Sequence, residues 1–351
     1  MAFDAFTHNE ILDVIRDEVP FQPFLLGMAF GMEHTTDDQT INFDQVDPDR
    51  RMSIFVNPRV PGQVAPDKGF AVRTYKPGYI KDKATVDPSY VFKRRAGEPI
   101  AQRMSNAERY AATVAGQAID MLTRLNRRLE WMAAQLLLAG TYTMSGTGIS
   151  VEVDMGRTNT HTVTLTNADR WGQTGVSPVM TIQNMLAKTR TPIRNIVMGN
   201  YAYADLIKDP AMEKLVYIQL QSGQGASVQF GPMQGTLEGV VYRGSLPSAG
   251  VNIYTYTHSY EDPDSSRTET LFIPEDAVLF IPDAMYGYQC YAAIWDSAAN
   301  YTGMPYFFKN WEEDDPGTPF LMLQSAPMLA HTRIDGTIAL RTGSTQPQSG
   351  K

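Results

Sequence analysis

Residues 105–140, SNAERYAATVAGQAIDMLTRLNRRLEWMAAQLLLAG, form the strongest structural signal in this 351-residue chain. Ser105 and Glu108 make a capping box, in which each side chain bonds the other residue's free backbone N–H at a helix start. Apolar side chains then recur at steps of four and three, and Gly140 is the residue type that favours a helix end. The stretch predicts one helix over 105–139, about 50 Å long at 1.5 Å per residue. The recurring apolar residues are Ala118, Leu122, Leu125, Leu129, Met132 and Leu136.

The segments around this helix mix helical and strand patterns without strict alternation, which predicts an α+β fold with two sheets. Residues 9–19 have the pattern of an amphipathic helix, and the next thirty are typical of an extended arm. Strand-like runs at 52–60 and 69–76 flank a Pro/Gly-rich turn and predict a long two-stranded hairpin. The remaining predicted strands are 149–153, 162–166, 193–198, 237–243, 251–257 and 268–273, and the remaining predicted helices are 177–189, 201–208 and 211–220.

Composition narrows the class of protein. The chain has 43% hydrophobic residues and a net charge of −8, from 30 basic and 38 acidic side chains. Its length suggests about two domains. Its one cysteine, Cys290, excludes an internal disulfide and favours a reducing compartment. The sequence predicts neither a membrane span nor a signal peptide, because the apolar stretches are short and the N-terminus is acidic. The acidic balance also argues against general nucleic-acid binding.

Charge is segregated along the chain. The net charge is −9 over residues 1–50, +7 over 51–103 and −10 over 261–315. We interpret the basic segment as complementary to an acidic protein surface, in the same chain or in a neighbouring copy, because it has few aromatic residues for stacking single-stranded nucleic acid. The alternative is that these charges only solvate loops. The candidate contact residues are Arg59, Lys68, Arg73, Lys76, Lys81, Lys83, Arg94 and Arg95 on the basic side, and Glu312, Glu313, Asp314 and Asp315 on the acidic side.

Motifs for chemistry are missing from the sequence. The five histidines are scattered, and no metalloprotease, CxxC, phosphate-loop, dinucleotide or nucleophile-elbow motif occurs. The acidic run at 312–315 lacks the loop pattern that arranges oxygens around Ca²⁺, so a solvated or partner-facing loop is the preferred interpretation. The sequence therefore predicts no catalytic residue, no metal and no cofactor.

Short phrases spread along the chain carry a family resemblance. They are VNP at 56–58, PGYIK at 77–81 continuing to VDP at 86–88, GTYTMSG at 140–146, VEVDMGR at 151–157, KNW at 309–311 and FLMLQSAPML at 320–329. Together, and in this order, they resemble the lambda-type major capsid (head) protein family of tailed bacteriophages.

The resemblance implies the Hong Kong 97-type capsid fold and a division of the chain. Residues 1–50 are expected to form an N-terminal arm, 51–95 an extended loop that lies across a neighbouring subunit, and 96–177 a peripheral domain containing the long helix as its spine. Residues 178–305 are expected to form an axial domain, 306–340 the return to the peripheral domain, and 341–351 a flexible tail. The candidates for the axial loop are Gly223, Gly225 and Gly231.

The resemblance also implies a function. The chain is expected to assemble as hexamers and pentamers into the icosahedral shell of a phage head in the host bacterial cytoplasm. That shell would enclose double-stranded DNA without sequence-specific binding. The short segment before the hairpin implies a separate scaffolding protein, and portal and decoration proteins are further expected partners. One alternative is an encapsulin-type nanocompartment with the same fold and protein cargo. A second, from another class, is a soluble enzyme whose site lies near the carboxylates at 312–315.

Overall fold

The structure is a computed structural model. It describes residues 21–46, 52–53, 55–59, 61, 70–86, 105–189, 191–212, 239–246, 249–262, 268–282, 286–313 and 318–345. The predicted helix at 9–19 lies outside these ranges, as does all of the predicted helix at 211–220 except its first two residues. No helix within the described ranges has both the length and the apolarity needed to cross a membrane.

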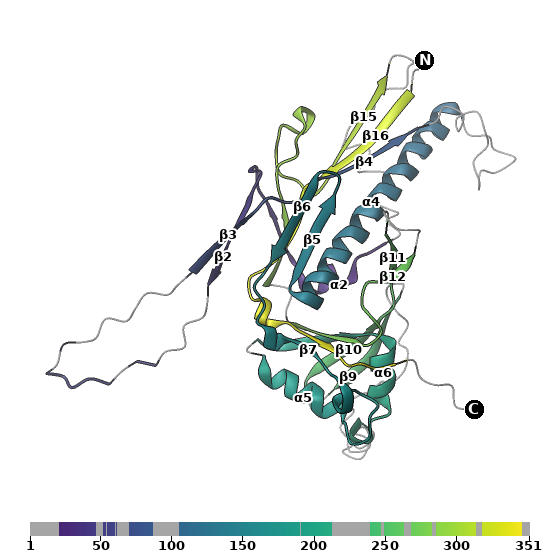
Figure 1. The fold of residues 1–351 in the computed structure, drawn as a ribbon. Helices are drawn as coiled ribbons and strands as arrows, with labels where there is room; N and C mark the ends of the chain where they lie inside the picture. The colour runs from purple at the N-terminus through teal and green to yellow at the C-terminus, as the bar shows by residue number, and fades with distance from the viewer. Residues whose placement is uncertain are drawn as a thin grey trace, which may run out of the picture.

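One long helix, α4 (Asn106–Ala139), runs through the upper part of the molecule (Figure 1). Its predicted start and end are confirmed: Ser105 and Glu108 form the capping box, and Gly140 adopts the left-handed conformation at φ 80°. All six residues of the predicted apolar stripe are at most 5% exposed. Local sequence therefore sets both ends of this helix and the face that it buries.

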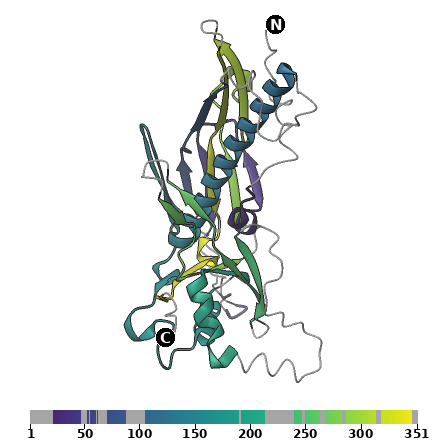
Figure 2. The same cartoon turned by 90° about the vertical axis from the view of Figure 1, so that its right-hand side faces the viewer.

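Three antiparallel strands lie along α4. Their order is β15 (Phe307–Glu313), β16 (Thr318–Ser325) and β4 (Ile80–Thr85), and the hairpin of β5 (Thr141–Gly146) and β6 (Ile149–Asp154) follows α4 directly. The views in Figures 1 and 2 show helix and strands running side by side in an elongated body.

A six-stranded sheet forms the lower part of the molecule. Its order is β7 (Thr162–Thr164), β18 (Ile338–Arg341), β13 (Ala277–Pro282), β8 (Ile193–Met198), β10 (Val251–Tyr256) and β9 (Val240–Leu246). Helices α5 (Pro178–Lys188) and α6 (Asn200–Ile207) lie below it, away from α4 (Figures 1 and 2). The predicted Ser-Pro start of α5 is confirmed, because the Ser177 side chain accepts a hydrogen bond from the Met180 N–H.

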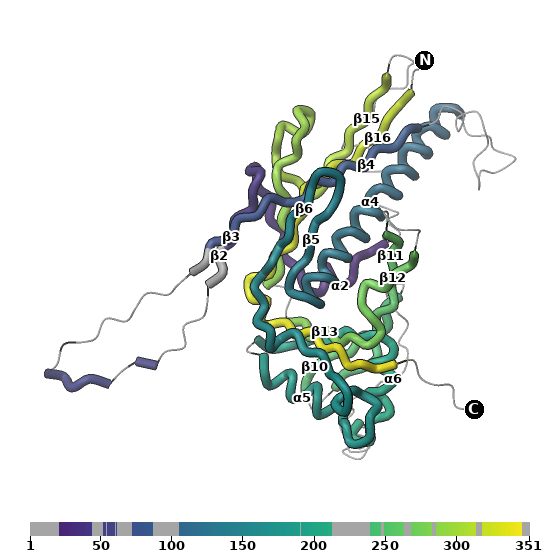
Figure 3. The backbone as a smooth tube through the Cα atoms, in the orientation of Figure 1, coloured from purple at the N-terminus to yellow at the C-terminus, as the bar shows by residue number. Residues whose placement is uncertain are grey.

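The N-terminal part of the described chain is folded, and our expectation of an extended arm over residues 20–50 is wrong for 24–29, which form a helix, whereas 32–35 and 41–46 are extended strands. Helix α2 (Phe24–Ala29) packs on α4, and β1 (Met32–Thr35) pairs in parallel with β14 (Gly287–Tyr291), which pairs with β17 (Pro327–His331). Figure 3 shows the C-terminal chain passing through β17 from the upper sheet to the six-stranded one. The arm acquires structure because residues far along the chain supply its partners.

The predicted hairpin has a different first strand. Strand β3 (Phe70–Tyr75) pairs with β2 (Ile41–Val46), and the described residues within 52–60 form no strand. Phe43 stacks on Tyr75 across the pair, and Ile41 is buried. Met52 and Phe55 are 89% and 103% exposed, so neither side chain packs on a sheet within the described part of the subunit. We call β2, β3 and the residues between them the ribbon.

The remaining elements are short. Strands β11 (Ser259–Glu261) and β12 (Glu269–Leu271) form a hairpin, and the described 3-10 turns are η1 (Asn159–His161), η2 (Asn167–Asp169), η4 (Ser297–Ala299) and η5 (Ile334–Gly336). The prediction of two sheets is wrong, because the described strands form six. Several strand pairs are local and lie apart in the elongated body, so they do not merge into larger sheets.

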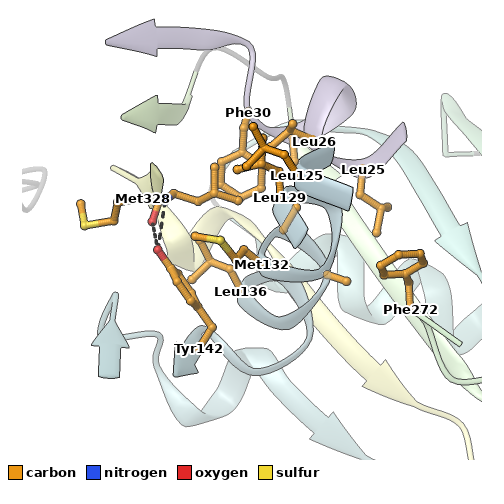
Figure 4. Close-up of a cluster of buried hydrophobic side chains, with 14 of the residues drawn as sticks. Leu25, Leu26, Phe30, Leu125, Leu129, Met132, Leu136, Tyr142, Phe272 and Met328 are labelled. Atoms are coloured by element: carbon orange, nitrogen blue, oxygen red, sulfur yellow. Dashed lines mark hydrogen bonds between the residues drawn. The ribbon is translucent and has the colours of Figure 1, made fainter. Parts of the chain in front are cut away.

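Two large hydrophobic cores hold the described residues together. One joins α2, α4 and the strands around them, and the other joins α5 and α6 to the six-stranded sheet. In Figure 4, Leu25 and Leu26 of α2 lie beside Leu125 and Leu129 of α4. The Tyr142 hydroxyl lies at the edge of this core, where it donates to the Leu329 carbonyl and accepts from the Leu329 N–H. The predicted domain boundaries stay a prediction.

Candidate assembly surfaces

The base of the ribbon is held by its own chain. The Arg73 guanidinium and the Tyr75 hydroxyl both donate to the carbonyl of Asp154 in β6. Gly156 permits this approach: its φ is 68°, and a Cβ there would lie 2.5 Å from Arg73 Nη2. Arg73, a predicted intersubunit residue, therefore has a partner within the subunit.

Strand β4 separates its charges between two faces, as the alternation of side chains in a strand requires. Asp82 points to α4 and pairs with Arg124 at 2.7 Å. Lys81 and Lys83 are exposed on the other face. The Nζ of Lys83 lies 3.7 Å from the centre of the Phe320 ring, and that of Lys81 lies 5.3 Å from the centre of the Tyr79 ring. Aromatic rings thus support these ammonium groups and leave them accessible.

The other predicted contact residues are spread over the molecule. Lys76 lies beside the Trp295 ring, 5.5 Å from its centre, and Arg59 is exposed in the connection between β2 and β3. Glu312 and Glu313 are exposed at the end of β15. The structure therefore brings Lys76, Lys81 and Lys83 to one region. The predicted residues outside the described ranges are Lys68, Arg94, Arg95, Asp314, Asp315, Gly223, Gly225 and Gly231.

A polar network fixes Trp295 where the ribbon joins the body. The Asp296 carboxylate accepts from Lys309 Nζ at 2.9 Å and from Gln324 Nε2 at 2.9 Å. The Tyr79 hydroxyl donates to Gln324 Oε1 at 2.6 Å and accepts from the Trp295 N–H at 3.0 Å. Burial alone would raise the pKa of Asp296, but the bonds from Lys309, Ala298 and Gln324 outweigh it and hold that pKa below its usual value. The network joins four segments of the chain around one ionised carboxylate.

Glu130 of α4 is a buried carboxylate that sequence analysis missed. Its oxygens accept from the backbone N–H groups of Phe24, Leu25 and Leu26 at 3.2, 2.8 and 3.0 Å, and from the Tyr256 hydroxyl at 2.8 Å. Burial raises the pKa of Glu130, and these four hydrogen bonds oppose that rise. The signal available in the sequence was that Glu130 is the one charged residue in the apolar run 129–139.

Arg157 binds the C-terminal end of α4. Its guanidinium donates to the carbonyls of Leu136 and Leu137 at 3.0 and 2.9 Å, and to Thr337 Oγ1 at 2.6 Å. These carbonyls belong to the last turn of α4, where the helix itself supplies no N–H donors; the Leu136 carbonyl also accepts from the Gly140 N–H at 2.8 Å. Burial lowers the pKa of Arg157 to about 10, so the side chain stays charged at neutral pH.

Groups that could carry chemistry are few in the described part of the chain. Those residues contain no group of three or more His, Cys, Asp or Glu side chains arranged to hold a metal ion. Cys290 is buried, and burial raises the pKa of its thiol to about 11, which makes it a poor nucleophile at neutral pH.

His331 gives the subunit a predicted pH dependence. It is 2% exposed, and burial together with the nearby Arg157 charge lowers its pKa to about 3. In the unfolded chain the pKa of His331 is about 6.5, so the unfolded state takes up a proton more readily than the folded state. The folded state is therefore fully stable above about pH 6.5 and loses stability as the pH falls towards 3. The expected slope below pH 6 is up to about 1.4 kcal/mol of unfolding free energy per pH unit. Urea unfolding of the unassembled subunit at pH 7, 6 and 5 measures it. A His331→Gln subunit should show a smaller slope, and equal slopes would contradict the prediction.

Comparison with known proteins places these features in a family context. A family model described as "Phage major capsid protein E" matches residues 7–342. The major capsid protein of Escherichia phage lambda is 24% identical over 333 residues, covering 92% of this chain and 95% of the relative. A solved structure titled as the putative capsid protein of an E. coli CFT073 prophage has a TM-score of 0.74 and 22% identity, over 96% of this chain and 99% of that one. The SrpI encapsulin of Synechococcus elongatus PCC 7942 is more distant, with a TM-score of 0.51 and 10% identity over 95% of this chain and 94% of that one.

Proposed function

Because the chain belongs to the phage major capsid protein E family, we propose that its copies assemble as hexamers and pentamers into an icosahedral head shell around double-stranded DNA. It is a major capsid protein of the lambda-like type with the Hong Kong 97-type capsid fold. The family is one of structural capsid proteins, and we infer that the chain has no catalytic role.

The observation that carries the proposal is the ribbon. It extends away from the body in Figure 1, and Met52, Phe55 and Val56 expose 89%, 103% and 44% of their surface. An exposed apolar patch in the connection between two paired strands is typical of an interaction surface, because an isolated strand pair is marginal alone in water. We infer that the ribbon lies on a neighbouring subunit.

Charge supports the orientation of that contact. We infer that the exposed cations of one subunit face the acidic residues Glu312 and Glu313 of another. A single exposed pair contributes about 0.2–1 kcal/mol. The same pair repeated at every contact of a shell favours one arrangement of subunits over others. The cations concerned are Lys76, Lys81 and Lys83, with Arg94 and Arg95 in the same basic segment.

The wider assembly follows from the same proposal. We infer that the segment containing Gly223, Gly225 and Gly231 meets its copies at capsomer centres. A separate scaffolding protein, a portal and a decoration protein are the inferred partners, and assembly takes place in the host bacterial cytoplasm. A net charge of −8 suits a shell that encloses DNA without gripping it in a sequence-specific way.

Among the alternatives, the likeness to the SrpI encapsulin is one of fold alone, whereas sequence similarity to phage capsid proteins spans nearly the whole chain. No observation on the described residues favours an enzyme near 312–315.

The deciding experiment is negative-stain electron microscopy of the fast-sedimenting fraction after expression, with and without a candidate scaffolding protein. Closed shells or tubes with a hexameric surface lattice support the proposal. Packaged DNA then supports a phage head, and packaged protein supports an encapsulin. Small oligomers under every condition would count against assembly into a shell.

Reversing two exposed cations tests the electrostatic part. Lys76→Glu with Lys81→Glu should leave a folded subunit by circular dichroism, since both side chains are exposed. We expect the concentration needed for assembly to rise severalfold and to fall again as salt screens the repulsion. The matched Lys76→Gln, Lys81→Gln variant should show a smaller effect.

Adding Glu312→Lys and Glu313→Lys to the reversed subunit should restore assembly, because the two charge patterns are then exchanged. Light scattering as a function of subunit concentration measures assembly. It is compared for the unmodified subunit, the reversed variant, the glutamine variant and the variant with all four changes. Unchanged assembly by the reversed variant would exclude charge pairing at these residues.

A further inference from the structure

The body of the subunit carries an open groove beside α2, which we call the α2 groove. It has a volume of about 440 Å³ and is lined mainly by Pro23, Leu26, Leu125, Leu129, Tyr291 and Tyr306. Glu33 lies at its rim and is exposed. The groove therefore combines apolar side chains with the two amides of Asn126 and Gln289, and it has one acidic residue, Glu33.

Gly27 of α2 leaves this groove open. It lines the groove, and a Cβ built on it would meet nothing within 4 Å. A glycine inside a helix destabilises it relative to alanine, because glycine loses more backbone entropy on folding. Nothing in the described part of the subunit requires a glycine at this position. Close approach of another chain would explain it.

Phe55 is a group of the right chemistry to fill the groove. Its side chain is 103% exposed, with Val56 beside it, so the pair makes an apolar projection between β2 and β3. A fully exposed side chain fills no groove of its own subunit. A second copy of the chain supplies it.

The body has a second groove, but the charges around the two grooves favour the α2 groove as the binding site of Phe55. The second groove, of about 230 Å³, is lined by Trp295 and Ile149 but also by Lys76 and Lys81. The segment that carries Phe55 is itself cationic, with Arg59 four residues on and Arg51 and Lys68 in the same connection. Like charges would oppose docking in the second groove, whereas Glu33 favours it in the α2 groove.

We propose that Phe55 of one subunit inserts into the α2 groove of a second copy, with the cations of the same segment facing Glu33. The proposal rests on the proposed function, since it names the seat of the ribbon on its neighbour. It places the contact on α2, the helix that the Glu130 carboxylate ties to α4.

Disulfide trapping tests the placement in assembled particles. Val56→Cys is combined with Pro23→Cys in the α2 groove, and in a matched control with Gln39→Cys at the other groove, so that Glu33 and Lys81 are kept. The native Cys290 is buried and gives little background. After mild oxidation, a non-reducing gel should show at least tenfold more linked subunits for the Pro23→Cys pair. Equal linkage, or more for the Gln39→Cys pair, would overturn the proposal.

Filling the groove is an independent test. Gly27→Leu adds a side chain into open space and should leave a folded subunit whose assembly falls at least tenfold. Gly27→Ala adds a single methyl group, so it should fold and should lower assembly much less. If Gly27→Leu forms shells as well as Gly27→Ala does, the groove is not the seat of Phe55, while the shell function stands. If the unmodified chain forms no shell, the proposed function falls, and this inference falls with it.

Discussion

Replacing Glu130 by alanine is expected to lower the free energy of unfolding by about 3–5 kcal/mol. The change removes the acceptor for the N–H groups of Leu25 and Leu26, for that of Phe24 and for the Tyr256 hydroxyl, and leaves these donors buried. Urea unfolding of the unassembled subunit measures the loss. Hydrogen exchange of residues 24–29 should rise first, because α2 loses its attachment to α4.

Two variants separate the roles of charge and volume. Glu130→Gln keeps the size and one acceptor oxygen, so we expect roughly half of the loss. Tyr256→Phe removes a single hydrogen bond and should cost about 1 kcal/mol. An unfolding free energy for Glu130→Ala within 1 kcal/mol of the unmodified subunit would show that the carboxylate is not what holds α2.

The second large effect is expected for Arg157→Ala, at about 3–4 kcal/mol. This guanidinium satisfies carbonyls of the last turn of α4 and also bonds Thr337, so its loss separates the end of the helix from the strand that follows η5. Thermal unfolding with circular dichroism measures the effect. Arg157→Lys should recover little, because an ammonium group cannot reproduce the planar fork of donors.

Arg128→Ala provides the control for charge on α4. That side chain is exposed and packs on Trp131, so its loss should cost less than 1 kcal/mol. A similar loss for Arg128→Ala and Arg157→Ala would mean that the effect comes from helix charge in general and not from the hydrogen bonds at the helix end.

The helix over 105–139 could be predicted in full because its signals are local. The capping box, the apolar stripe and Gly140 all lie within the helix and act between residues a few positions apart. The predicted strand at 52–60 was wrong for the opposite reason. An alternating pattern shows that a segment is able to form a strand. Whether a partner strand is available depends on distant residues, and the partner of β3 is β2 at 41–46.

The candidate contact residues show the same limit. Sequence composition located the cationic segment, and the structure shows Lys76, Lys81 and Lys83 exposed as a surface contact requires. The sequence alone could not show that Arg73 bonds the Asp154 carbonyl, because the two residues are 81 positions apart. Glu130 was missed for the same reason, since its partners lie more than 100 positions away in both directions.

The parallel pairing of β1 with β14 has a consequence for when a subunit becomes complete. Residues 32–35 pair with residues 288–291, and the third strand of that sheet ends at His331. During synthesis, the first strand of this sheet leaves the ribosome long before its two neighbours exist. The sheet can close only when translation is nearly finished, because contacts of such large sequence separation wait for the whole intervening chain. A polypeptide that ends before residue 327 therefore lacks one strand of this sheet, and one that ends before residue 287 leaves β1 without its partner.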